Sequence, residues 1–428
     1  MPSFSRVLSL KDRRTFALRS RVAVVVVVLG AAFAGADPAT AKPPGLGCGE
    51  TITASKTLQA DLTNCPNQGI VIGADNVTLN LNGHSIDGDA VDAECPQAEP
   101  CDVGVANPDG HDGIRITGGT IREFGLGVFV GAGAERNRVH NVSLTANTYF
   151  GAIFDGTTDS VITHSSFTDT GISGLLLFDA TRARISHNAF SDLHGYAIVL
   201  RNGVFDSQIS HNAINSSDHG IVLDDGGARN RIDHNTVSNS NGSAIDTGGG
   251  ARENRFEHNR LIDNGDGLVS AGALDTVFRH NIVTGSGAPE TEAGGFGIIL
   301  DGAVRNTVEK NVFTGGRGPA MLVVQWESPT PPTDNALLRN TANSKFDDGI
   351  FVDAPAIGTR VERNVAYRSG GDGIDIDAAG TTVQRNLAFG NAELGIEAVA
   401  GVIDAGGNRA FGNGDRAQCL NVVCSRSR

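Results

Sequence analysis

Residues 209–237 read ISHNAINSSDHGIVLDDGGARNRIDHNTV, in which Ile-Ser-His-Asn at 209–212 returns as Ile-Asp-His-Asn at 232–235. The same phrase recurs along the chain, with an apolar residue shortly before each asparagine and another shortly after it. Ser165 fills the one vacant place in the series, whose mean period is about 24 residues. The repeated positions are Asn141, Asn188, Asn212, Asn235, Asn259, Asn281, Asn311, Asn340, Asn364, Asn386 and Asn408.

Each repeat is too short, and too rich in Gly, Thr, Val and Ile, to hold two helices. Strands fit better. One unit is predicted to contain a strand over 220–223, a turn over 224–227, a strand ending at 231–234 and a third strand through Val237. The pattern therefore predicts three strands per coil, stacked in parallel on the next coil.

The recurrent asparagine is expected at the bend between two strands, because Asn tolerates the left-handed region better than most residues. Stacked at the strand spacing of about 4.8 Å, each amide could bond to the amides above and below it. Related phrases at 81–86 and 116–121 place the first coil near residue 70. The chain is thus predicted to form about fourteen coils.

This pattern resembles the right-handed parallel β-helix proteins of the pectin-lyase-like superfamily, including carbohydrate-binding and sugar-hydrolysis type repeats, over roughly residues 48 to 415. The resemblance implies an all-β solenoid and a polysaccharide-binding or polysaccharide-processing protein of the lyase or glycoside hydrolase type. The alternative is a non-catalytic surface, adhesion or structural repeat protein, since one fold hosts many chemistries. Whether the chain is an enzyme stays open.

The first 41 residues differ from the rest. They combine a basic start, a 15-residue apolar run over 22–36 and a small-residue cleavage site at 39–41. We interpret 1–41 as an export signal peptide, with Arg13-Arg14 consistent with the twin-arginine route. An uncleaved membrane anchor is the alternative, although the run is short for a bilayer span. Residues 42–428 are then one β-helix domain, secreted, periplasmic or at the cell surface.

Six cysteines agree with export, and they fall in three close pairs along the chain. Sequence alone does not determine their connectivity. The pairs lie at the first coil, in an inserted loop and at the last coil, where disulfides would protect the open ends of a solenoid. They are Cys48 and Cys65, Cys95 and Cys101, and Cys419 and Cys424. Metal binding by these cysteines would require ligands from distant coils.

The formal net charge of −14 becomes more negative once the basic signal is removed. This argues against nucleic acid as a partner. It also disfavours polyanionic sugars unless Ca²⁺ bridges the two acidic surfaces. The insertion from Asp87 to Asp112 is rich in acidic residues and could bind Ca²⁺, although its spacing matches no known calcium loop and a solvated loop is the alternative. No other cofactor is indicated.

A histidine stands one residue before most of the repeated asparagines. The column consists of His140, His164, His187, His211, His234, His258 and His280, and continues as Lys310, Arg339, Arg363 and Arg385. Because a stacked column of unpaired cations could not be buried, we expect a solvent-facing polar stripe. Adventitious metal binding by the imidazoles is the alternative.

Aspartates recur after the first strand of many coils, where most would accept bonds from the following turn. Arg201 takes the place of Asp between Asp179 and Asp224, and Tyr196 aligns with His219 one residue before the strand. The aspartate column consists of Asp155, Asp179, Asp224, Asp246, Asp301, Asp353 and Asp377.

These alignments predict a candidate catalytic cluster on adjacent coils, formed by Tyr196, Arg201, His219, Asp224 and Asp246, with Asp225 nearby. A lyase needs a base for the C5 proton of a uronic acid and a cation for the intermediate, which Tyr or His with Arg could supply. A hydrolase needs two carboxylates, which Asp224 and Asp246 could supply. Alternatively, the arginine only relieves repulsion in the aspartate column.

The outward position of the first strand is expected to be apolar over most coils, turning acidic at Asp375 and Glu397. Such a face indicates a covered or partner-binding surface, and self-association is one use of it. If inward and outward positions are exchanged, this conclusion reverses. The predicted members are Phe129, Ile153, Leu177, Val199, Val222, Ala244, Val269, Ile299 and Phe351.

Two insertions lengthen consecutive repeats, at 286–296 and 326–335. They are predicted to rise on opposite sides of the first sheet and to form a short trough that binds a neutral sugar. Trp326, Glu327 and Glu292 are the candidate substrate-binding residues, with Glu290 nearby. Plain tolerated loops are the alternative.

Overall fold

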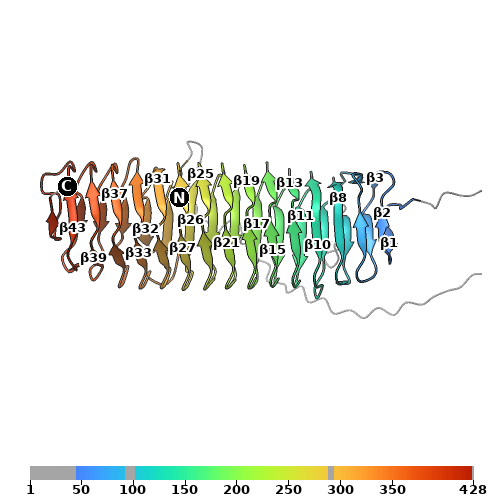
Figure 1. Ribbon diagram of the computed structural model, residues 1–428, viewed down its shortest axis with the longest axis horizontal. Coiled ribbons are helices and arrows are strands. Elements are labelled where there is room, and N and C mark those ends of the chain that lie inside the picture. The colour runs from blue at the N-terminus through green and yellow to red at the C-terminus, as the bar shows by residue number, and fades with distance from the viewer. Residues whose placement is uncertain (1–44, 92–101, 288–293, 427–428) are drawn as a thin grey trace, which may run out of the picture.

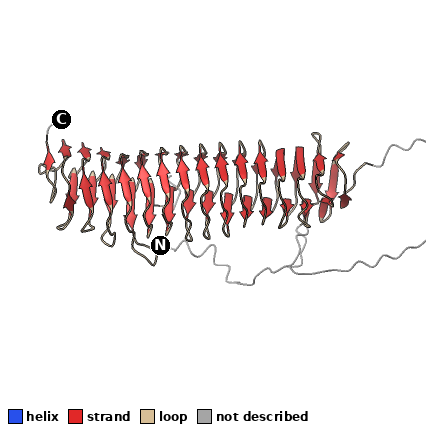
Figure 2. Cartoon of the chain, turned by 60° about the horizontal axis from the view of Figure 1, so that its bottom comes forward, coloured by secondary structure: helices blue, strands red, loops and turns tan. Residues whose placement is uncertain are grey.

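The computed structural model describes residues 45–91, 102–287 and 294–426, which wind into one long rod of stacked coils (Figure 1). All regular elements in these ranges are strands, and every pairing between them is parallel (Figure 2). Each regular coil contributes three strands, as predicted. Within the described ranges, no helix is long and apolar enough to cross a membrane.

The first sheet contains one strand from each coil and runs the whole length of the rod. Its fifteen strands are β1 (Glu50–Ile52), β4 (Gln68–Ile72), β7 (Val103–Asn107), β9 (Leu126–Val130), β11 (Phe150–Asp155), β14 (Ser173–Phe178), β17 (Tyr196–Arg201), β20 (His219–Leu223), β23 (Ser243–Thr247), β26 (Asp266–Ala271), β29 (Ile298–Asp301), β32 (Met321–Val324), β35 (Ile350–Val352), β38 (Ile374–Ile376) and β41 (Ile396–Ala398).

The second stack follows the first sheet in each coil. It contains β2 (Lys56–Thr57), β5 (Thr78–Asn80), β12 (Val161–Thr163), β15 (Arg184–Ser186), β18 (Gln208–Ser210), β21 (Arg231–Asp233), β24 (Arg255–Glu257), β27 (Val277–Arg279), β30 (Thr307–Glu309), β33 (Ala336–Leu338), β36 (Arg360–Glu362), β39 (Thr382–Gln384) and β42 (Ile403–Asp404).

The third stack closes each coil. It contains β3 (Leu62–Cys65), β6 (Ser85–Gly88), β13 (Ser166–Thr168), β16 (Ala189–Ser191), β19 (Ala213–Asn215), β22 (Thr236–Ser238), β25 (Arg260–Ile262), β28 (Ile282–Thr284), β31 (Val312–Gly316), β34 (Thr341–Ser344), β37 (Val365–Tyr367), β40 (Leu387–Phe389), β43 (Asn408–Phe411) and β44 (Cys424–Ser425). The longer β8 (Arg115–Arg122) and β10 (Arg138–Thr145) run through both stacks.

The winding begins at β1 and not near residue 70, so the rod has about one coil more than predicted. The first coils carry no asparagine of the repeated kind, and the sequence pattern therefore missed them.

The interior is a continuous apolar column to which all three strands of a coil contribute. In the coil of β20, Ile221, Leu223, Ile232 and Val237 are fully buried. Phenylalanines stack inside in the same way, and the rings of Phe167 and Phe190 lie 4.6 Å apart. Since coils touch mainly their neighbours, each coil buries its apolar side chains against the next one.

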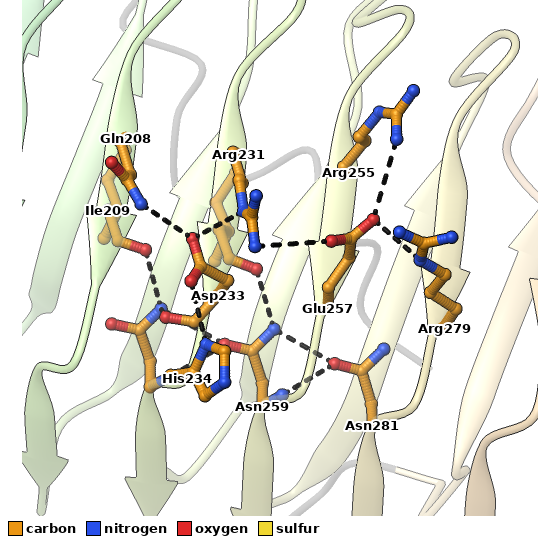
Figure 3. Close-up of polar contacts among 12 residues, drawn as sticks. Gln208, Ile209, Arg231, Asp233, His234, Arg255, Glu257, Asn259, Arg279 and Asn281 are labelled. Carbon is orange, nitrogen blue, oxygen red and sulfur yellow. Dashed lines mark hydrogen bonds and ion pairs between the residues drawn. The ribbon is translucent and has the colours of Figure 1, made fainter.

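Ten of the repeated asparagines form one hydrogen-bonded ladder inside the rod, from Asn188 to Asn408 (part of it is drawn in Figure 3). In a typical step, the Asn259 side-chain nitrogen donates to the Asn281 side-chain oxygen at 3.0 Å and to the Ile232 carbonyl at 2.9 Å. The same Asn281 oxygen accepts the Asn259 backbone N–H at 2.9 Å. The predicted ladder is confirmed.

Two details of the bend prediction are wrong. The left-handed residue is the one before the ladder, for example His234 with φ 56°, and the asparagine itself points into the rod. Asn141 does not join the ladder: it is exposed with φ 54°, and Val142 takes the ladder position and donates to Ser165. The cause is the unbroken strand β10, which shifts Asn141 by one residue.

Disulfides lie at both ends of the rod. Cys48 is bonded to Cys65 in the first coil, and Cys419 is bonded to Cys424 after the last one. These two close pairings and their places agree with the expectation. Cys95 and Cys101 lie outside the described residues, as does the predicted signal at 1–41.

Candidate functional site

The outer face of the first sheet carries three files of side chains that run along the rod. The first file stands at the strand starts and includes Tyr196, His219, Ser243 and Asp266. The second file occupies the middle of each strand, and the third follows the last inward residue, as at Arg201. Side chains from successive coils are therefore neighbours on this face.

The second file faces outward, as predicted, but two of its members were assigned one or two residues away from their true positions. The pairing places Leu176 and Asp246 in the file, while Leu177 and Ala244 are fully buried inside. The register between strands is determined by which residues point into the rod, whereas the prediction aligned the coils by their aspartates. The file runs Phe129, Ile153, Leu176, Val199, Val222, Asp246, Val269, Ile299, Leu322, Phe351, Asp375 and Glu397.

Tyr196 and His219 pair across β17 and β20 as predicted, and their rings stack at 5.3 Å. The His219 Nδ1 accepts the backbone N–H of Ser243 at 3.2 Å, so the proton of a neutral imidazole lies on Nε2, 3.9 Å from Asp218. Burial lowers the pKa of His219, and burial also raises the pKa of the Tyr196 hydroxyl. Both side chains are thus neutral hydrogen-bond donors near neutral pH.

Arg201 is already paired. Its Nε donates to Asp225 at 2.8 Å, and on the sheet it lies next to Phe178 on one side and beside Asp224 on the other. The expected aspartate neighbour, Asp179, falls in the following turn with φ 49°. Arg201 therefore neutralises an exposed carboxylate, and the reading that it relieves repulsion fits this geometry.

Asp246 lies in the middle file of β23, diagonally across from Asp224 at the end of the neighbouring coil's strand. It was predicted to lie in the same file as Asp224, which is wrong. Its neighbours in register are Val222 and Val269, both apolar. Desolvation, with the charges of Asp224 and Asp266, raises the pKa of Asp246 to about 7. A carboxyl in this state can donate a proton at neutral pH.

The cluster is better suited to acid–base chemistry between carboxyls than to proton abstraction by tyrosine. A tyrosine base would need a pKa below its ordinary value, whereas that of Tyr196 lies above it. The lone pair of His219 is engaged by Ser243, and Arg201 by Asp225. Asp246 and Asp224 remain as a proton donor and a partner carboxylate.

The predicted trough between the two insertions includes residues 288–293, which lie outside the described residues, so it stays a prediction. The rings of Phe296 and Trp326 meet edge to face at 5.4 Å, and Phe296 packs against the cluster of Ile299 and Leu322, which are 6% and 2% exposed. Trp326 itself is 55% exposed. The three backbone N–H groups of residues 326–328 donate to the Asp301 carboxylate and hold this loop. Glu327 is exposed, and Glu290 and Glu292 lie outside the described residues.

A second acidic group, beyond this aromatic contact, was not among the predicted sites. Asp372, Asp375 and Glu397 bring carboxylate oxygens within 4.8 Å of one another. Desolvation is the largest cause of the raised pKa values, about 8 for Asp372 and about 7 for Asp375. Nearby, Asp348 has a pKa of about 6 for the same reason.

These hard oxygen ligands fit a cation such as Ca²⁺ better than a soft metal. The described part of the 87–112 insertion gives less support for a Ca²⁺ site. There, Asp87 is ion-paired with Arg122 at 2.9 Å.

The sequence contained a signal for the missed residues. Asp266, Asp348 and Asp372 each stand directly before a Gly-apolar pair that opens the first strand. That is the place of Tyr196 and His219 in earlier coils. Following this file would have placed Asp372 beside Asp375 and Glu397, which the sequence had already indicated as the acidic end of the middle file.

The histidine column is exposed along its whole length, as predicted, and so are Lys310, Arg339, Arg363 and Arg385.

Comparison with known proteins agrees with the fold. The family described as right handed beta helix region matches residues 60–261, 202–337 and 232–408, which confirms the predicted hand and architecture. No curated protein matches the chain.

Among solved structures, the tailspike protein of E. coli bacteriophage HK620 in complex with pentasaccharide has 10% identity and a TM-score of 0.57, covering 86% of this chain and 73% of that chain. A mutant of the same tailspike has 11% identity, the same coverage and a TM-score of 0.56. The Azotobacter vinelandii mannuronan C-5 epimerase AlgE4 A-module has 11% identity and a TM-score of 0.49, covering 84% and 91%. At such identities the likeness concerns the fold.

Proposed function

The chain belongs to the right-handed β-helix family, and we propose that it binds a polysaccharide on the outer face of its first sheet and hydrolyses it there. The observation that carries the proposal is the carboxyl of Asp246, which has a pKa of about 7 beside Asp224 on an apolar part of that face. The pentasaccharide complex of a tailspike with this fold supports the substrate class.

In the proposed reaction, protonated Asp246 donates its proton to the glycosidic oxygen as the bond to the anomeric carbon breaks. Asp224 accepts a proton from the water that attacks this carbon. In this proposal the Tyr196 hydroxyl donates a hydrogen bond to a sugar hydroxyl, and His219 positions the Tyr196 ring by stacking against it. Arg201 keeps the neighbouring Asp225 neutralised.

The apolar neighbours favour an uncharged sugar. Val199, Val222 and Val269 flank the cluster and can pack against the apolar faces of sugar rings, as can the exposed ring of Trp326. Uronic acids would meet unpaired carboxylates here, in a chain whose net charge is already −14. Glu327 and Glu292 stay candidate contacts at the end of this surface.

The test is incubation of the protein with a panel of neutral and uronic acid polysaccharides, with and without Ca²⁺. New reducing ends without an unsaturated product are expected. Asp246→Asn should abolish them. Asp179→Asn is the matched control, because it makes the same change in an exposed turn off the face. Equal activity in Asp246→Asn and the native protein would refute the site, and an absorbing unsaturated product would mean a lyase.

A non-catalytic role is the second candidate, supported by the apolar file from Phe129 to Val222 that precedes the cluster. In that case the rod is a surface or adhesion protein and this file binds a partner or a second copy. Sugar binding or self-association without any cleavage would be the result. Analytical ultracentrifugation over a concentration series separates self-association from a monomer.

We also propose that the protein is exported and loses residues 1–41. The two described disulfides support an oxidising compartment. Mass spectrometry of the N-terminus of protein recovered from the medium, periplasm and cells would test this, and a retained Met1 in every fraction would contradict it.

A further inference from the structure

The histidine column forms a stacked ladder at the bend between the second and third stacks. Adjacent imidazole centroids lie 4.9 to 5.3 Å apart from His140 to His280. Most pairs are nearly parallel, with an angle of 2° between His164 and His187. Because the rings cover one another's faces, their polar edges are the parts left for solvent or a ligand.

The bend is concave. A hollow of about 840 Å³ lies at its N-terminal part, with His164 and His187 on its surface. Most of its other walls carry small side chains, among them Ser143, Ser166 and Ala189. A polymer strand can therefore approach the histidine edges closely.

The charges around the ladder differ between its two halves. From β12 to β19 the strands before and after the bend carry no acidic side chain, while Arg138 and Arg184 lie on strands before it. Farther along, the buried carboxylates of Asp233 and Glu257 form ion pairs with neighbouring basic side chains (Figure 3). The Arg279 Nε, for example, lies 2.8 Å from Glu257. The charged groups facing that half are Arg231, Asp233, Arg255, Glu257, Arg260 and Arg279.

We propose that this bend, which we term the histidine groove, binds an extended acidic polysaccharide with one carboxylate per sugar when its imidazoles are protonated. Its centre is His164, His187 and His211, and Arg138 and Arg184 stand on the strands that lead into the bend. The groove is separate from the outer face of the first sheet, so the proposal stands or falls independently of the hydrolase assignment.

The ligand class follows from the charge pattern. One cation per coil, about every 5 Å, matches a polymer that carries its anions singly along an extended chain. Duplex DNA presents one charge per about 1.7 Å of axis and would leave most phosphates unpaired. The column also continues as Lys310, Arg339, Arg363 and Arg385, so basic side chains extend it at one end.

Protonation of the imidazoles is expected to control polyanion binding because the rest of the protein is acidic. The net charge of −14 repels a polyanion unless the imidazoles of the groove carry a positive charge. The neighbours also matter: desolvation and the charges of His280 and His234 lower the pKa of His258. Loading with protons is therefore expected to proceed gradually along the ladder.

The test measures binding of polygalacturonate by the full protein with isothermal titration calorimetry at about pH 5.5 and about pH 7.5. Several modest surface ion pairs act together, so we expect the dissociation constant to be about tenfold lower at the acidic pH. The triple substitution His164→Asn, His187→Asn and His211→Asn should remove the gain. Asn suits this left-handed backbone, so the variant is expected to fold.

Replacing the same three histidines by arginine should give tight binding at both pH values, because arginine already occupies this column at Arg339 and Arg363. His194→Asn is the matched control, since His194 is exposed but lies outside the ladder against Asp169. A native affinity that does not change with pH, or an unchanged asparagine triple variant, would overturn the proposal. So would preferential binding of duplex DNA or of methyl-esterified polygalacturonate.

Discussion

Asn259→Ala should destabilise the protein by about 3–5 kcal/mol, because it removes four side-chain hydrogen bonds from a site that is 1% exposed. Two of these bonds are accepted by the Asn259 oxygen, from the backbone and the side chain of Asn235, at 3.0 and 3.1 Å. The other two are donated to Ile232 and Asn281. Each typically contributes about 1 kcal/mol, and the groups left behind are buried.

Urea unfolding followed by circular dichroism would measure the loss. Hydrogen exchange would localise it, since the amide of Asn235 should exchange faster. Asn141→Gly is the matched control: it lies in the same sequence pattern but outside the ladder, and its φ of 54° suits glycine. A change within about 0.5 kcal/mol is expected there. If the two substitutions cost the same, or Asn259→Ala costs under about 1 kcal/mol, the ladder does not stabilise the rod as argued.

The remaining predictions concern charge. The pKa values of Asp246, Asp372 and Asp375 are about 7, 8 and 7, above the ordinary 3.8, so the native state holds protons that the unfolded chain releases. Stability should therefore fall as the pH rises from about 4 to about 8, as measured by urea midpoints, and Asp375→Asn should flatten the trend. At about pH 8, Ca²⁺ at about 100 times its dissociation constant should add about 2.7 kcal/mol, measured as a higher melting temperature that Asp375→Asn abolishes. Arg279→Ala should cost about 2 kcal/mol in urea unfolding, because Glu257 loses its nearest cation while two other arginines remain near it; a loss below about 0.5 kcal/mol would contradict this account.

The fold could be predicted from the sequence because the repeated asparagine has a structural role in every coil of the ladder. Each buried amide donates to the coil behind and to the coil ahead, and its oxygen accepts from the coil behind, so Asn188 to Asn408 mark the winding in the sequence itself. The first coils use Leu58, Leu79 and Leu81 inside and no such amide, and they were placed too late for that reason.

The candidate site was only partly readable, because its geometry depends on register. Counting by aspartates put Asp246 beside Asp224, whereas the inward residues Ile245 and Thr247 turn Asp246 into the middle of the sheet. The stacking of Tyr196 on His219 was predictable, since both stand at the same strand position. The contact between Phe296 and Trp326 was not, because the path of a loop leaves no periodic trace in the sequence.

The ladder between Asn281 and Asn311 closes across 30 residues with the same 3.0 Å bond that elsewhere closes across 22, so extra residues are absorbed outside the rod. Lengthening a loop therefore costs the interior little, while a shift of one residue inside a strand would reverse every side chain after it. A molecule built this way can gain or lose whole turns, or carry new loops at any turn, and still close at both ends. The number of coils and the loops on the surface can therefore change independently, which makes the rod a suitable scaffold for grafting new loops.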